Sequence, residues 1–202
     1  MFYTTESNAH GLPHDPFKAI VSPRPIGWIG SKSRDGALNL APYSFFNAVS
    51  SDPPVVMFSS DTVKDSFTNI VETGVFTANL VSRDLVEKMN VTSAPLARGE
   101  SEFEAAGLTA LAGRLVDAPY VAEAYAVLEC RLTTTMAAPT LEGFDSPNRM
   151  VFGQVVGIHI RDEAISENGL LDMKKVRPVA RMGYMDYADG GEPFQLKRPT
   201  SR

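Results

Sequence analysis

Short apolar runs alternate with turn residues along the whole chain, and most of these runs are rich in β-branched and aromatic side chains. The runs are separated by many of the 15 glycines and 14 prolines. This pattern is typical of a β-dominated domain, because β-branched and aromatic residues pack well on a pleated surface. Strands are predicted over residues 25–33, 38–41, 44–50, 55–60, 75–80, 126–136 and 150–161. Their regular spacing favours a barrel or a sandwich.

Helical signals are confined to two short segments. Residues 65–72 begin with capping-type residues, carry apolar side chains three and four positions apart, and stop before Gly74, a residue that commonly ends helices. Residues 83–90 have a similar apolar spacing after Asp84. Both helices are expected to pack outside a barrel. The predicted fold class is therefore a β-dominated α+β fold with a few peripheral helices.

Composition and charge narrow the classes of protein to consider. At 202 residues, with 44% hydrophobic and 21% charged residues, the chain is expected to form one globular domain over residues 1–188, followed by an extension over 189–202. A net charge of −5 gives no general attraction to nucleic acid or to an anionic membrane surface. A single cysteine, Cys130, permits no intrachain disulfide, and from the N-terminal residues and the short apolar runs we expect neither a leader peptide nor a bilayer-spanning stretch. We expect a cytoplasmic protein.

An aromatic strand broken by a proline is the first candidate binding feature. Residues 25–33 and 38–41 form a predicted hairpin around Asp35-Gly36, and the second strand is interrupted at Pro42. Because proline donates no hydrogen bond to a sheet, Pro42 indicates an edge or a bulge. Each aromatic residue here, taken alone, is more simply a core residue. Together with Asn39, Ser44 and Asn47 they offer the apolar surface and the polar groups that bind a flat heteroaromatic ring.

A hydroxyl-rich segment at the start of the predicted helix is the second feature. Residues 59–66 contain Ser59, Ser60, Thr62 and Ser66, with Lys64 just before the helix begins. Unpaired N–H groups at a helix N-terminus, with nearby hydroxyls and one cation, are suited to a phosphate group. The alternative is a solvated loop in which Asp65 or Ser66 is a simple N-cap.

These two features occur within a segment that closely resembles the flavin reductase-like FMN-binding split-barrel family, which includes the flavoredoxins. The resemblance is dense over residues 14–80 and returns weakly over 177–184. The sequence departs from the family pattern at Ser66, where threonine is usual. Serine retains a hydroxyl at this position. The matching residues are Arg24 to Trp28, Asn39 to Phe46, Pro53-Pro54, Lys64-Asp65, Asn69-Ile70, Phe76 and Asn79.

The resemblance implies a homodimer of six-stranded split barrels, with FMN bound near the subunit interface. The flavin ring would lie against residues 41–46, and the phosphate would meet Ser31, Ser59, Lys64 and Ser66. The predicted cofactor-binding residues are Ser31, Asn39, Ala41, Pro42, Tyr43, Ser44, Phe45, Phe46, Ser59, Lys64, Asp65 and Ser66. The resemblance is specific for the fold and the cofactor, and much less so for the reaction.

Three functions remain open. The first is an oxidoreductase that passes reducing equivalents from NADH or NADPH through FMN to a flavin or another acceptor; since the flavin does the chemistry, no catalytic side chain is assigned. The second is a flavoredoxin-like electron carrier that takes electrons from a protein donor without using nicotinamide. The third is a split barrel without a cofactor, in which the aromatic strand packs a dimer interface.

The remaining chemistry-bearing residues have simpler interpretations. His10, His14 and His159 share no metal-ligand spacing, so no metal site is predicted, and His159 is expected on a strand surface. Cys130 is expected to be a small buried apolar residue. Arg98 either reaches a ligand phosphate or faces solvent.

Overall fold

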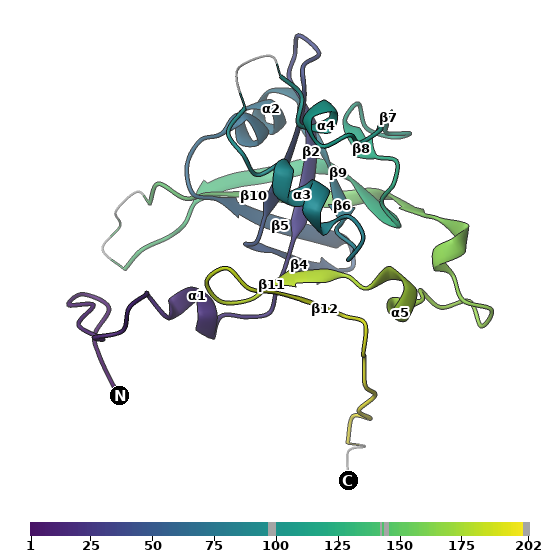
Figure 1. Cartoon of the computed structure of the whole chain (residues 1–202). Coiled ribbons are helices and arrows are strands. Elements are labelled where there is room, and N and C mark those ends of the chain that lie inside the picture. The colour runs from purple at the N-terminus through teal and green to yellow at the C-terminus, as the bar shows by residue number, and fades with distance from the viewer. Residues whose placement is uncertain (97–99, 142, 144–145, 200–202) are drawn as a thin grey trace.

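The computed structural model describes residues 1–96, 100–141, 143 and 146–199 (Figure 1). Its centre is an antiparallel sheet of seven strands. All seven predicted strands are present, whereas the resemblance implied a barrel of six. In sheet order they are β3 (Leu38–Tyr43), β2 (Gly27–Lys32), β6 (Val75–Leu80), β9 (Ala126–Ala137), β10 (Arg149–Ile160), β5 (Pro54–Ser60) and β4 (Phe46–Ser51).

The sheet curls because its two edge strands are consecutive in the chain. Only Ser44 and Phe45 separate the end of β3 from the start of β4. The backbone N–H of Ser59 on β5 donates to the carbonyl oxygen of Phe45, with an N to O distance of 2.8 Å. This bond extends the β4–β5 ladder to the residue next to the end of β3, so the two edges of the sheet meet at residues 44–45 and close a barrel.

The barrel interior forms one apolar cluster around Phe58 and Phe76, whose rings meet edge to face. Gly153 on β10 permits this packing, because a Cβ atom there would come within 2.4 Å of the Phe76 ring. Cys130 is fully buried in the same cluster, as predicted, and burial raises the pKa of its thiol to about 12. The thiol is therefore neutral at physiological pH and packs as an apolar side chain.

A second apolar cluster covers the outer face of β3, β2, β6 and β9. It lies beneath α3 (Val86–Val91), α4 (Glu102–Ala105) and the hairpin of β7 (Ala110–Ala112) and β8 (Pro119–Val121). Trp28 is fully buried there, and its indole N–H donates to the Thr92 hydroxyl at 2.9 Å. The predicted helix over 83–90 begins later than expected, because Ser82 and Arg83 pair with the backbone of residues 177–178.

The predicted helix over 65–72 is α2 (Asp65–Thr73), which packs on β2, β3 and β6 at one end of the barrel. It ends at Gly74, whose φ of 76° is in the left-handed region that favours glycine. Its buried residues are Ser66, Asn69 and Ile70. Two polar side chains on the buried face mean that α2 docks through hydrogen bonds as well as apolar contact.

A separate small sheet lies below the barrel in Figure 1. Its strands, in order, are β1 (Arg24–Pro25), β11 (Val179–Arg181) and β12 (Tyr187–Asp189). The short helix α1 (Phe17–Ile20) packs against it at Gly183, where a Cβ atom would come within 2.6 Å of the Ala19 Cβ. The remaining short elements are the 3₁₀ helix η1 (Asp162–Ala164) and α5 (Met173–Val176), and residues 190–199 contain no regular element.

No helix within the described ranges combines the length and the apolar character that crossing a bilayer requires.

A buried carboxylate anchors the loop between β7 and β8. Glu129 on β9 is 1% exposed and accepts hydrogen bonds from the backbone N–H groups of Arg114, Leu115 and Val116 at 2.7–3.0 Å. It also pairs with His159, which lies on β10 as predicted but is bonded inward to this carboxylate. Burial raises the pKa of Glu129, but these hydrogen bonds outweigh it and the net pKa lies below its ordinary value.

We predict that Glu129→Gln lowers the free energy of unfolding at pH 7 by about 2 kcal/mol, because the amide replaces one acceptor oxygen with a donor facing N–H groups. The lowered pKa of Glu129 stabilises the fold above the unfolded-state value of about 4.3, and that contribution is lost as the pH falls through the folded-state value. Denaturant unfolding from pH 7 to pH 3 should therefore show that the unfolding free energies of the unchanged protein and of the Glu129→Gln variant converge at low pH. A constant difference across the range, or an equal loss in the exposed variant Glu104→Gln, would contradict this account.

Candidate flavin site

The aromatic segment lies on the open edge of the sheet, where Pro42 is compatible with strand pairing. Pro42 stands opposite Trp28 in β2, and β3 has no strand on its other side. On this open side, the N–H of Leu40 donates to a carboxylate oxygen of Glu102 on α4, with an N to O distance of 3.1 Å. Burial raises the pKa of the Glu102 carboxyl above its ordinary value. The prediction that Pro42 marks an edge is confirmed.

Beyond Leu40 the strand becomes accessible. Ala41, Pro42, Ser44, Phe45 and Phe46 are all half-buried. They are contiguous in the chain from the end of β3 to the start of β4, and Ala41 and Phe46 also pack against the interior cluster of the barrel. Such a mainly apolar segment has the chemical character required to support a flat ring.

Tyr43 points into the barrel and is separated from this accessible surface. It is 7% exposed, and its ring packs on Phe58 with a centroid distance of 4.6 Å. Burial raises the pKa of its hydroxyl, which lies near Ser66 and Ser60. Among the described residues this hydroxyl has no partner in a well-formed hydrogen bond. Tyr43 therefore supports the strand from behind, with one unsatisfied polar atom beneath α2.

Two buried hydrogen bonds hold α2 on the barrel. The Asn39 amide donates to the Ser66 hydroxyl at 3.1 Å, and the Asn69 amide donates to the Ser31 hydroxyl at 3.2 Å. Ser31 and Ser66 are 0% and 1% exposed. Their side chains are thus engaged in docking the helix, which gives Ser31 and Ser66 a structural task that the sequence did not indicate.

The outer part of the same helix end is open. Ser59 is half-buried, while Lys64 and Asp65 are exposed. The side chain of Lys64, at the N-cap position, pairs with Asp61 at 2.7 Å instead of capping the helix, and this pairing lowers the pKa of Asp61. The first N–H groups of α2 therefore face a loop that carries a cation and a hydroxyl, an arrangement suited to an anionic group.

The two halves of the predicted site meet at one hydrogen bond. Ser59 belongs to the hydroxyl-rich half and Phe45 to the aromatic half, and their backbones are joined by the N–H to O contact described above. Sequence reasoning noted Ser60 and Asn69 without assigning them to the site, and it missed Glu102. Of these, Asn69 could have been assigned from its position three residues after Ser66 on one helix face. Arg98 lies outside the described residues.

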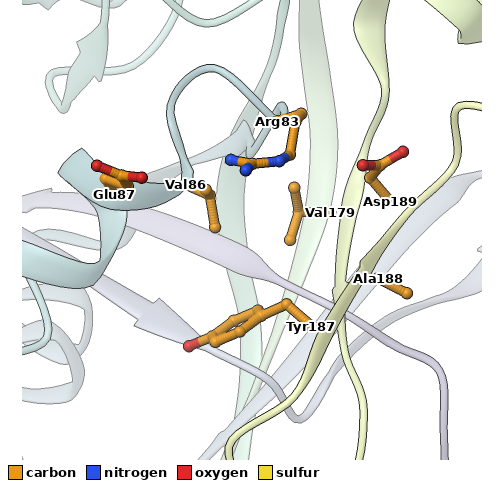
Figure 2. Close-up of a pocket in the computed structure, with 7 residues that line it drawn as sticks. All are labelled: Arg83, Val86, Glu87, Val179, Tyr187, Ala188 and Asp189. Atoms are coloured by element: carbon orange, nitrogen blue, oxygen red, sulfur yellow. The ribbon is translucent and has the colours of Figure 1, made fainter.

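Two cavities lie elsewhere. The first, about 310 Å³, is a partly open pocket lined by residues of α3 and of the β11–β12 strands, and Figure 2 shows Arg83, Glu87 and Tyr187 around it. The second, about 240 Å³, is apolar and has Phe46 on its wall. Of the predicted cofactor-binding residues in the described chain, only Phe46 borders either cavity. The candidate flavin site is therefore an open surface along β3, β4 and the start of α2, and its residues fit a ring with a phosphate-bearing tail.

Comparison with known proteins identifies the family and supports the fold. Residues 21–180 match the family model described as the flavin reductase like domain. Nitrilotriacetate monooxygenase component B from Bacillus cereus is 30% identical, with a TM-score of 0.85 over 97% of this chain and 98% of that one. A split-barrel protein from Shewanella frigidimarina is 26% identical, with a TM-score of 0.82 over 98% and 100% of the two chains. The flavoredoxin of Desulfovibrio vulgaris is 26% identical, with a TM-score of 0.77 over 88% and 91%.

The matched family model spans most of the chain, and the barrel agrees with the split barrel of the similar structure. The segment whose sequence resembles the family most densely forms the open edge described above. The protein belongs to the flavin reductase-like family of split-barrel flavoproteins.

Proposed function

We propose that this protein is an FMN-dependent oxidoreductase that takes reducing equivalents from NADH or NADPH and passes them to a second flavin or another acceptor. The observation that carries the proposal is the junction of a half-buried apolar strip with the open N-terminus of α2, linked through Ser59 and Phe45. Bound FMN would supply the hydride-accepting chemistry. The task left to the chain is to hold the cofactor and to leave one face of it accessible.

Each part of the site has a proposed role. Ala41, Pro42, Phe45 and Phe46 would support the ring, with Ser44 available for a polar contact at its edge. Ser59, Lys64 and the first N–H groups of α2 would bind the phosphate, and Asp65 would fix the start of the helix. Asn39, Ser31, Ser66 and Tyr43 would act from beneath by holding α2 and β3 in position.

A homodimer, with FMN near the subunit interface, is part of the proposal. Residues 47–51 of β4 are exposed, and apolar side chains further along the same sheet reach solvent at Met136 on β9 and Ile158 on β10. Exposed apolar residues along a sheet with an open edge strand suit association with a second copy.

The second candidate function is a flavoredoxin-like electron carrier that does not use nicotinamide. The flavoredoxin of Desulfovibrio vulgaris favours it, since it shares the fold over most of both chains. The two candidates differ in the electron donor and make the same demand on the flavin site.

We predict that purified protein with FMN oxidises NADH or NADPH, without air, faster than free FMN does, because the ordered site holds the ring for hydride transfer. Stopped-flow absorbance of the bound flavin measures the rate. Failure with both nucleotides, while dithionite still reduces the bound flavin, would favour the electron carrier. A protein that binds no flavin would contradict both functions and leave the cofactor-free barrel.

We predict that Lys64→Ala weakens FMN binding by about 1.5 kcal/mol, which is roughly tenfold, through loss of a charge-assisted contact to the phosphate. The expected loss in binding free energy is small for a charge-assisted contact, because the Lys64 side chain is about half exposed and already pairs with Asp61. Fluorescence titration should show no matching loss for riboflavin, which lacks the phosphate. Lys175→Ala, which removes another exposed, ion-paired lysine, is the control. An unchanged affinity for FMN would exclude Lys64 from the site.

A further inference from the structure

Two cationic side chains lie beside the proposed ring surface, and a third stands opposite one of them in the small sheet. They are Lys18 on α1, Arg24 on β1 and Arg181 on β11. Arg24 and Arg181 stand opposite each other in the small sheet. The Lys18 ammonium and the Arg24 guanidinium each lie 5.9 Å from the centre of the Phe45 ring. The pairing of β1 with β11 thus adds a charge from a distant segment to the two that lie against Phe45.

Among the described residues, the partners of this cation cluster of Lys18, Arg24 and Arg181 are backbone oxygens and the rings of Phe45 and Tyr187. Arg24 donates to the carbonyl oxygens of Lys18, Val21 and Met182, and Arg181 donates to that of Tyr184. Within the described part of the chain, no member of the cluster forms an ion pair. In contrast, carboxylate partners are present for Lys32, Lys64, Arg161, Lys175 and Arg177.

The arrangement is electrostatically unsatisfied. Arg24 is 7% exposed, and its Nε atom is buried without a hydrogen-bond partner in the described residues. Burial, and then repulsion from Arg181, lower the pKa of Arg24. A buried cation next to a like charge is costly unless an anion offsets it. The chain as a whole carries a charge of −5, so this local excess of positive charge stands out against its surroundings.

We propose that the cation cluster binds the phosphate or pyrophosphate group of a nucleotide that approaches the flavin as the second reactant. Lys18 is exposed and Arg181 half-buried, so these two would make the direct contacts, while Arg24 adds positive charge from behind. A guanidinium and an ammonium together suit a phosphate group. Phe45 belongs to the proposed ring surface, so an anion bound here lies beside the ring. The nucleotide assignment therefore rests on the proposed function, whereas the anion site itself does not.

The test is calorimetric titration of the protein with inorganic pyrophosphate and with ADP, each in the absence and in the presence of saturating FMN. We expect both probes to bind to either form. Lys18→Ala and Arg181→Ala should each weaken binding by about tenfold, and added salt should weaken it further. Lys174→Ala removes an exposed lysine from another four-residue helix and is the matched control. Thermal unfolding of each variant checks that the fold is retained.

The outcomes separate this inference from the proposed function. Pyrophosphate binding that depends on Lys18 and Arg181 in a protein that binds no FMN would support the anion site and contradict the proposed function. Absence of binding, or equal weakening by Lys174→Ala, would overturn the anion site. Mutual exclusion of pyrophosphate and FMN would assign the cluster to the phosphate of FMN itself, and would overturn its assignment to a second reactant.

Discussion

The docking of α2 on the end of the barrel is the constraint on which the rest of the site depends. The buried bonds from Asn39 to Ser66 and from Asn69 to Ser31 set both the position and the direction of the helix. Because the donors and acceptors are buried, leaving any one of them unpaired would be costly. The open N-terminus of α2 is thereby held at a fixed place relative to the aromatic edge of the sheet.

The strands of the barrel were predictable from the sequence, because each is a short run whose side chains suit a pleated surface and whose ends carry turn residues. Val75–Leu80 matches its predicted range, and α2 stops at Gly74 for the reason that the sequence indicated. The short outer elements were not predictable in the same way. The β7–β8 hairpin depends on Glu129, a residue from a strand elsewhere in the chain, and a local pattern contains no trace of such a contact.

Site residues show the same division. The accessible strip around Pro42 follows from local chemistry, since proline marks the open edge. The sequence does not show which serine hydroxyls are buried, so Ser31, Ser59 and Ser66 had equal standing as phosphate ligands. Only the fold shows that Ser31 and Ser66 are buried, whereas Ser59 is accessible. Arg181 joins Lys18 and Arg24 only through the pairing of β1 with β11, so no local motif contains all three members of the cation cluster.

We propose that one surface binds both ends of FMN, with the ring along residues 41–46 and the phosphate at the start of α2. A crystal structure of the protein grown with FMN would locate both groups. We expect phosphate density within hydrogen-bond reach of Lys64 and the first N–H groups of α2, with the ring against Pro42 and Phe45. Phosphate density remote from α2, or a ring bound away from this strip, would contradict it.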